Sequence, residues 1–257
     1  MKIAVTGKGG VGKTTFSAVL ARLYADEGRK VLAADVDPDA NLGMALGFTP
    51  EELEGITPIS KMRTLIAERT GASAETFGKF FKINPKVDDI PDMLAKDKNG
   101  VKLLVMGTVE TAGTGCVCPE HVMLKQVISH LIIRREDVVI MDMEAGLEHL
   151  GRGTADMMDQ FVVVVEPGER SIQTFNKVVQ LAGELGISKV RVVANKVRNK
   201  ADEDYITSRI PADKLLGFIH YDTDIAEADR AGNSPYDNSE KTVAEIRAIK
   251  QRIDTES

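Results

Sequence analysis

The nine residues GKGGVGKTT (Gly7–Thr15) constrain the fold of this chain most strongly. They fit the pattern G-x-x-x-x-G-K-[ST] and lie between the apolar run KIAVT and a segment of helical periodicity. Glycines let backbone N–H groups turn toward phosphate oxygens, and the dipole of the following helix adds to the attraction. Lys13 would neutralise the β- and γ-phosphates, and the Thr14 hydroxyl would bind Mg²⁺. The sequence therefore predicts a triphosphate site formed by Gly7, Gly9, Gly10, Val11, Gly12, Lys13, Thr14 and Thr15.

Short apolar runs alternate with helical patterns along the chain. The segments TTFSAVLARLYADEG and SIQTFNKVVQLAGELG have apolar residues three and four positions apart and end at a glycine, as amphipathic helices do. Most apolar runs are continuous, which is typical of strands covered on both faces. We predict a doubly wound α/β fold, with a mostly parallel sheet and helices on both faces. The predicted strands are Lys2–Thr6, Lys30–Ala34, Val101–Met106, Val138–Asp142, Phe161–Val165, Val190–Asn195 and Lys214–Ile219.

The segment from about 49 to 100 interrupts this alternation. It is polar and rich in lysine, and it contains Pro50, Pro58, Pro85 and Pro91. Its apolar content is poor for a unit that folds independently. We therefore predict an insertion packed against the same core, within one P-loop domain that spans residues 1–257.

Composition limits the possible partners and the compartment. The net charge of −6 argues against nucleic-acid binding, because neutralising phosphates requires a basic surface. No apolar run approaches the roughly 18 residues of a membrane span. The N-terminus lacks the pattern of a signal peptide, and the chain has only two cysteines. We expect a cytoplasmic protein whose partners include neither nucleic acid nor a membrane.

Two acidic stretches follow predicted strands. DVDPDAN begins at Asp35, and DMEAG begins at Asp142. Open α/β sheets place their chemistry at the carboxyl ends of strands, so we expect Asp35, Asp37 and Asp142 to lie near the phosphate-binding loop. Carboxylates there suit phosphoryl transfer, in which the protein mainly positions and neutralises. The alternative for each aspartate is a helix N-cap or a turn residue.

A late predicted strand ends in NKVRN, which begins with Asn195 and Lys196. Guanine-specific enzymes place an aspartate three residues after such an asparagine, and here that position holds Arg198. An asparagine amide alone can pair with adenine. The pattern favours ATP over GTP, with an ordinary loop asparagine as the alternative.

The loop carries a second lysine, Lys8, which one set of phosphates does not need. In this respect it resembles the deviant Walker A of the MinD/ParA/nitrogenase-iron-protein group of ATPases, as DVDPDAN resembles its switch I and DMEAG its Walker B and switch II. The resemblance implies that Lys8 reaches the nucleotide of a partner subunit and that Asp37 orients or activates the attacking water. It also implies that Asp35 supports the magnesium sphere and that Asp142 holds Mg²⁺ through water. Lys8, Lys13 and Asp37 are thus the expected catalytic residues, although Lys8 could instead be a solvated surface lysine.

Both cysteines, Cys116 and Cys118, lie in TGCVCPEH just before a helix predicted to begin near Pro119. A disulfide across one residue would close a small, strained ring. A helix N-terminus favours the thiolate, which is the form that binds metals. Two thiolates supply half of a tetrahedral or square-planar site, and a two-fold dimer would supply four. The alternative is a turn that happens to contain two small residues.

Taken in order, the motifs GKGGVGKTT, DVDPDAN, GCVCPE, DMEAGLEHLGRGT and NKVRN resemble the nickel-insertion ATPases of anaerobic carbon monoxide dehydrogenase (CooC type). The resemblance covers nearly the whole chain and includes NPKVDD in the insertion. It implies that Cys116 and Cys118 bind Ni²⁺ (or Zn²⁺) at a homodimer interface. It further implies that ATP, with Mg²⁺ as its cofactor, drives dimerisation and that carbon monoxide dehydrogenase is the client. The residues themselves leave open whether the homodimer depends on ATP, on metal or on both.

Two other functions stay open on the sequence. A MinD/ParA-like positioning ATPase would use a C-terminal amphipathic helix on membranes, and here Val243, Ile246, Ile249 and Ile253 form only a narrow stripe that we expect to pack on the core. An electron-transfer ATPase of the nitrogenase-iron-protein kind would hold an iron–sulfur cluster between two subunits. Such proteins take one cysteine from switch II, and the switch II stretch here has none.

Overall fold

The computed structural model describes residues 1–72, 81–107, 118–134, 138–144, 157–187 and 189–255. These residues form an eight-stranded sheet in the order β3-β4-β2-β5-β1-β6-β7-β8. Every neighbouring pair is parallel except β3 and β4. The strands are β1 (Lys2–Thr6), β2 (Val31–Asp35), β3 (Lys96–Lys98), β4 (Val101–Val105), β5 (Val138–Asp142), β6 (Gln160–Val165), β7 (Val190–Val197) and β8 (Leu215–His220).

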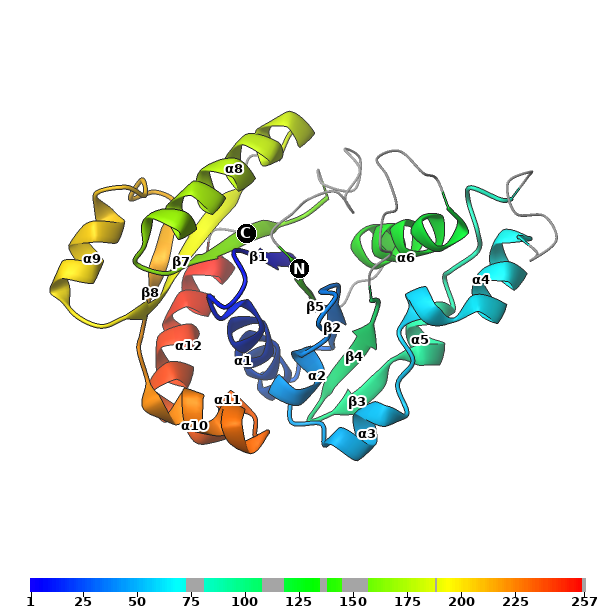
Figure 1. The fold of residues 1–257 in the computed structure, drawn as a ribbon, viewed down its shortest axis with the longest axis horizontal. Coiled ribbons are helices and arrows are strands. Elements are labelled where there is room, and N and C mark those ends of the chain that lie inside the picture. Colours follow the sequence, from blue (N-terminus) through cyan, green and yellow to red (C-terminus); the bar gives the residue numbers. More distant parts are fainter. Residues whose placement is uncertain (73–80, 108–117, 135–137, 145–156, 188, 256–257) are drawn as a thin grey trace.

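Helices cover both faces of this sheet (Figure 1). The larger ones are α1 (Lys13–Asp26), α6 (Pro119–Arg134), α8 (Glu169–Leu185) and α12 (Glu240–Thr255). The shorter ones are α2 (Leu42–Ala45), α3 (Pro50–Glu54), η1 (Ile59–Lys61), α4 (Arg63–Thr70), α5 (Ile90–Leu94), α9 (Lys200–Thr207), α10 (Thr223–Ala231) and α11 (Pro235–Asn238).

Successive residues of the central strands point to opposite faces and enter two separate cores. Ile3 and Val5 of β1 pack in a cluster with residues of α1 and α12. Ala4, between them, joins the cluster on the other face, which contains residues of α6 and α8. Continuous apolar strands are needed because both faces are buried. The predicted doubly wound α/β fold is therefore confirmed.

The segment predicted as an insertion contributes to one of these cores. Ile59, Ile66, Val87 and Ile90 are buried in the same cluster as residues of β4 and α6. One strand was not predicted: Lys96–Lys98 pairs antiparallel with β4 and forms the last strand on that side of the sheet. The sequence KDK has no apolar residue to indicate a strand, and charge on an edge strand prevents pairing with other chains.

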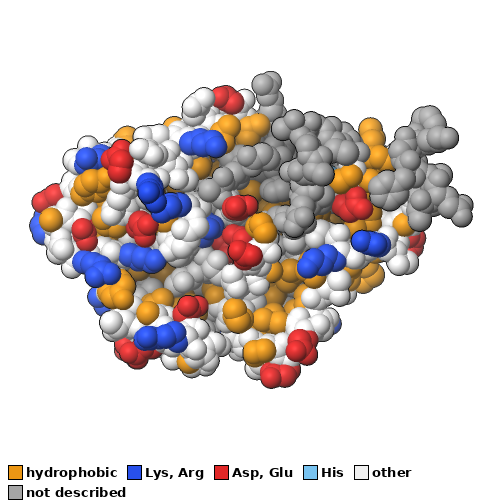
Figure 2. All heavy atoms as spheres, in the orientation of Figure 1, with side chains coloured by type: hydrophobic (Ala, Val, Ile, Leu, Met, Phe, Trp, Pro, Cys, Tyr) orange, Lys and Arg blue, Asp and Glu red, His pale blue; other side chains and the backbone are white. Residues whose placement is uncertain are grey.

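The C-terminal stripe packs on the core, as expected. Val243, Ile246, Ile249 and Ile253 are all buried against the cluster that contains α1. No helix in the described ranges is long and apolar enough to cross a membrane. Figure 2 shows acidic and basic side chains interspersed over the described part of one face.

Sheet register brings the acidic turns together. Asp35, the last residue of β2, is the Cα partner of Asp142, the last residue of β5. Asp142 also pairs in register with Val5 of β1, one residue before the strand enters the phosphate-binding loop. The motifs predicted after three separate strands thus meet at the carboxyl ends of β1, β2 and β5.

Candidate functional site

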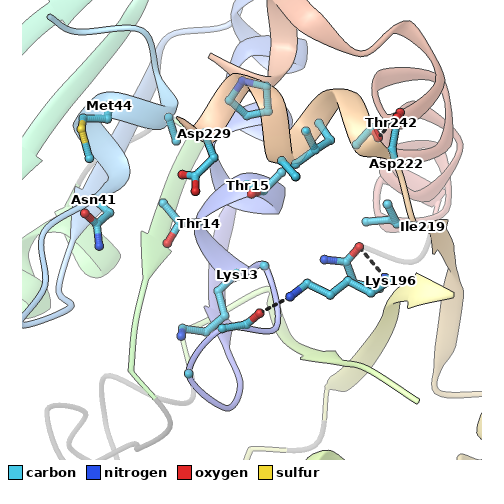
Figure 3. Close-up of a pocket in the computed structure, with 18 of the residues that line it drawn as sticks. Lys13, Thr14, Thr15, Asn41, Met44, Lys196, Ile219, Asp222, Asp229 and Thr242 are labelled. Carbon is cyan, nitrogen blue, oxygen red and sulfur yellow. Dashed lines mark hydrogen bonds between the residues drawn. The ribbon is translucent and has the colours of Figure 1, made fainter. Parts of the chain in front are cut away.

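A pocket of about 800 Å³ opens where the phosphate-binding loop enters α1 (Figure 3). Gly12 is the N-cap of α1, and because glycine has no side chain it gives this end of the helix no capping hydrogen bond. The first helical turn carries no acidic residue. Uncapped N–H groups and the positive end of the helix dipole attract an anion. This end of α1 is therefore suited to hold phosphate.

Two loop glycines are required by their surroundings. Gly12 has φ 95°, in the left-handed region, and a Cβ there would collide with the side-chain amide of Asn195. Gly7 has φ 150°, and a Cβ there would overlap the backbone carbonyl of Val164 on β6. These positions exclude other residues through both backbone conformation and space. Gly9 and Gly10 line the pocket with open space around them, and Val11 is buried beneath the loop.

Lys13 and Thr14 bring the loop into contact with the acidic strand ends. The Lys13 ammonium lies 3.8 Å from a carboxylate oxygen of Asp37, and the lysine side chain is almost fully buried. The Thr14 hydroxyl donates to Asp142 Oδ2 at 2.7 Å. Ser17, one turn further along α1, donates to Asp142 Oδ1 at 3.3 Å, a contact that the sequence did not predict. Thr15 also lines the pocket.

Burial makes this cluster electrostatically unusual. Desolvation, reinforced by the charge of Asp142, raises the pKa of Asp35 to about 7. Desolvation also raises the pKa of Asp142 to about 6, although the Thr14 hydrogen bond and the Lys13 charge oppose this shift. Among the described residues, Lys13 is the cation beside these three carboxylates, so the cluster favours an added positive charge. Hard oxygen donors from Thr14 and Asp142, held 2.7 Å apart, fit the preference of Mg²⁺.

Asp35 and Asp37 shape the turn that follows β2. Both oxygens of Asp35 accept backbone N–H groups, one from Leu42 at 2.9 Å and one from Asp37 at 3.2 Å. Asp37 Oδ1 accepts from the backbone of Asp39 at 3.0 Å, which leaves Oδ2 toward Lys13. The buried Asp35 therefore stabilises the turn through hydrogen bonds to its backbone, whereas Asp37 lines the pocket.

Lys8 lies beside an acidic residue of the same chain. Its ammonium is 3.9 Å from Glu166 Oε1, and about a third of each side chain is exposed. Glu166 follows β6, and its backbone N–H donates to Ser171 Oγ at 3.0 Å. The contact is long and partly solvated, so it holds Lys8 weakly. Nothing in the local sequence around Lys8 pointed to Glu166, which is 158 positions away.

Asn195 and Lys196 hold the phosphate-binding loop from behind. Asn195 Nδ2 donates to the backbone carbonyl of Val11 at 2.7 Å, and its Oδ1 accepts the backbone N–H of Lys196 at 2.8 Å. The Lys196 ammonium donates to the carbonyl of Gly10 at 2.6 Å, as Figure 3 shows. Lys196 has a positive φ of 58°, which a lysine rarely adopts. The structure thus gives both residues a role in bracing the loop, which the sequence did not suggest.

A second wall of the pocket was missed by the sequence analysis. It comes from the end of β8, the segment after it and α10, and Figure 3 shows Ile219 and Asp222 on the opposite side of the view from Asn41 and Met44. Tyr221 in this wall lies against Arg198, whose guanidinium is 4.3 Å from the ring centroid. The available signal was the predicted strand Lys214–Ile219, because its carboxyl end lies at the same sheet edge as the other motifs.

The cysteine pair is only partly within the described residues. Cys116 lies outside them. Cys118 is half-buried directly before α6, which begins at Pro119 as predicted, and its sulfur accepts the backbone N–H of His121 at 3.4 Å. Among the described residues, no group of three or more His, Cys, Asp and Glu is placed to hold a metal ion.

Comparison with known proteins identifies the family. The CobQ/CobB/MinD/ParA nucleotide binding domain matches residues 2–236, which include the loop, both acidic turns and the NK pair. The chain belongs to this family. The predicted membership of the MinD/ParA group is confirmed.

Family members with similar sequences extend over the whole chain. The carbon monoxide dehydrogenase accessory protein CooC of Rhodospirillum rubrum is 49% identical over 98% of this chain and 97% of its own length. An uncharacterised ATP-binding protein of Methanocaldococcus jannaschii is 44% identical over 97% of this chain and 96% of its own length. The resemblance to CooC-type proteins is thereby confirmed.

Solved structures of more distant family members share the fold. MinD in the MinC:MinD cell division complex of Aquifex aeolicus superimposes with a TM-score of 0.70 at 19% identity, covering 100% of this chain and 97% of that chain. MinD of Pyrococcus horikoshii complexed with Mg-ADP gives a TM-score of 0.64 at 22% identity, covering 98% of this chain and 96% of that chain. At these identities the agreement concerns the fold.

Proposed function

We propose that this protein is an ATP-hydrolysing metallochaperone that assists nickel insertion into carbon monoxide dehydrogenase. The observation that carries the proposal is the 49% identity, over 98% of the chain, to a carbon monoxide dehydrogenase accessory protein. The pocket at the start of α1 supports the nucleotide part of the proposal. A reducing cytoplasm would keep both thiols available to metal.

The chemistry proposed for the pocket is phosphoryl transfer from ATP to water. The uncapped N-terminus of α1 and Lys13 bind the phosphates and neutralise the charge that develops on them. Asp37, which faces the pocket beside Lys13, orients the attacking water. Thr14 and Asp142 are the residues suited to hold Mg²⁺, which would supply positive charge to neutralise the phosphates. The hydrogen bond from the Thr14 hydroxyl to Asp142 already places these two groups side by side.

The proposal requires two copies of the chain. Within the described part of the chain, Lys8 makes a long contact to Glu166, so little free energy is lost when it turns toward the phosphates of a partner's nucleotide. Dimerisation would also bring Cys116 and Cys118 together with the same pair of the partner. Nickel is the substrate of this four-sulfur site, and Zn²⁺ has similar ligand preferences. Nucleotide and metal occupancy are then coupled through one interface, and the coupling is reciprocal.

The decisive experiment measures assembly and metal content together. Size-exclusion chromatography with anaerobic metal analysis is run without ligand, with nickel, and with a non-hydrolysable ATP analogue. We expect a dimer that carries nickel, and we expect the double variant Cys116→Ala/Cys118→Ala to lose the metal while keeping ATP binding. Nickel binding by that variant at the wild-type affinity would exclude the cysteine site. Four irons per dimer would instead favour the electron-transfer alternative, and ATP-dependent sedimentation with liposomes or DNA would favour a positioning ATPase.

A further inference from the structure

The short helix α2 forms part of the pocket wall, and hydrogen bonds hold both of its ends in addition to the packing of the buried Leu42. Asn41, Met44 and Ala45 line the pocket (Figure 3). At the start of α2, the backbone N–H of Leu42 donates to Asp35 at 2.9 Å. A helix of four residues has almost no stability of its own, because the cost of nucleation is not repaid over so few hydrogen bonds. Contacts to the rest of the molecule must therefore hold it.

At its other end, α2 is held by a serine 189 positions further along the chain. The hydroxyl of Ser234 donates to the backbone carbonyl of Ala45 at 2.8 Å. Ser234 is 4% exposed, so water competes little for this bond. Its oxygen also accepts the backbone N–H of Tyr236 at 3.3 Å, which makes Ser234 the N-cap of α11. One hydroxyl thus joins the end of α2 to the start of α11.

α11 is in turn fastened to α1, the helix that follows the phosphate-binding loop. The Tyr236 hydroxyl donates to Asp26 on α1. Arg22, also on α1, lies 3.5 Å from Asp237, and its guanidinium lies 4.4 Å from the Tyr236 ring centroid. Figure 1 shows α1, α2 and α11 on the same side of the sheet. The contacts therefore run from α1 through α11 and Ser234 to α2, and from α2 to Asp35.

We propose that Ser234 is a positioning residue for ATP hydrolysis, which holds the turn carrying Asp37 in place by anchoring the far end of α2. This inference rests on the hydrolytic function proposed above. The turn lies between two supports, Asp35 before it and α2 after it. Loss of the Ser234 bond leaves the first support intact and removes one hydrogen bond from the second, so Asp37 is placed less well beside Lys13 and the γ-phosphate. Misplacement by about 1 Å is enough to slow a reaction strongly.

The test compares ATP and its non-hydrolysable analogue, which carry a γ-phosphate, with ADP, which does not. In Ser234→Ala, kcat for ATP should fall about fivefold, the factor that corresponds to one hydrogen bond of about 1 kcal/mol. The affinity for ADP, which lacks the γ-phosphate, should stay within about twofold of the wild type. Only the non-hydrolysable ATP analogue carries a γ-phosphate beside Asp37 and Lys13, so the ratio of its affinity to that of ADP should change. Ser234→Thr keeps the hydroxyl and should restore both readouts.

Thr70 offers a matched control for a purely structural effect. Its buried hydroxyl also donates to a helix carbonyl, that of Ile66 at 2.6 Å, and also accepts a backbone N–H, that of Ala72 at 3.3 Å. Thr70 is on α4 and does not line the pocket. Thr70→Val should lower the unfolding temperature without changing kcat or the affinity ratio.

The outcomes separate this inference from the proposed function. Unchanged kcat and affinity ratio in Ser234→Ala would overturn the role of Ser234, as would an equal loss in Thr70→Val. If the wild type binds ATP but does not hydrolyse it, the proposed activity fails. The affinity ratio still decides the inference in that case, because it requires binding and no turnover.

Discussion

Asn195 could support the phosphate-binding loop or recognise adenine, and one substitution distinguishes these two roles. Its amide was predicted to pair with adenine, whereas its contacts in the structure are with the phosphate-binding loop. Asn195→Ala removes the donor to the Val11 carbonyl and the acceptor for the Lys196 N–H, both at a site that is 8% exposed. Each lost bond costs about 1 kcal/mol, and a buried group left without a partner costs about 1–3 kcal/mol. We expect the free energy of unfolding to fall by roughly 2–4 kcal/mol.

The assay that distinguishes the roles is titration with ATP and with inorganic tripolyphosphate. A loosened loop binds every phosphate chain less well, so both ligands should lose affinity by a similar factor, about tenfold for a loss of 1.4 kcal/mol. Lys196→Met removes only the second brace, at Gly10, and should give a smaller loss of the same kind. A loss confined to ATP, with tripolyphosphate affinity unchanged, would refute the brace and assign Asn195 to the base.

Three further predictions follow from the contacts of the site. Gly12→Ala should abolish nucleotide binding measured by calorimetry, because φ is 95° and the new methyl group collides with Asn195; near-normal binding would contradict this. Lys8→Ala should leave ADP affinity unchanged but prevent ATP-dependent dimerisation in light scattering, while Glu166→Gln, which frees Lys8, should not impair it. In metal-free buffer, stability to urea should decrease as pH rises from about 4 to 7. The raised pKa values of Asp35 and Asp142 mean that the folded chain binds more protons than the unfolded chain over this range. Asp35→Asn should flatten the profile, and an unchanged slope would show that Asp35 is not the group responsible.

Much of the fold could be predicted because its signals are local. Continuous apolar runs between helical patterns indicate buried parallel strands, and the predicted strands Lys2–Thr6 and Val138–Asp142 have the same bounds in the structure. The edge strand Lys96–Lys98 could not be predicted in this way, since its pairing with β4 depends on backbone groups and not on its charged side chains. Asp35 and Asp142 were grouped because open α/β sheets bind ligands at the carboxyl ends of their strands. The same reasoning applies to the carboxyl end of β8, which also lines the pocket, but it was not used there.

The sequence by itself determined where phosphate can bind, because glycine spacing, Lys13 and the following helix act within one short segment. It also determined that aspartates would stand at strand ends beside that loop. Only the tertiary structure decided what holds these parts in place. The Val11 carbonyl meets Asn195 across 184 positions, and the Ala45 carbonyl meets Ser234 across 189. Such partners are set by the packing of distant elements, and a hydrogen bond to a backbone carbonyl leaves no pattern in the sequence around either residue.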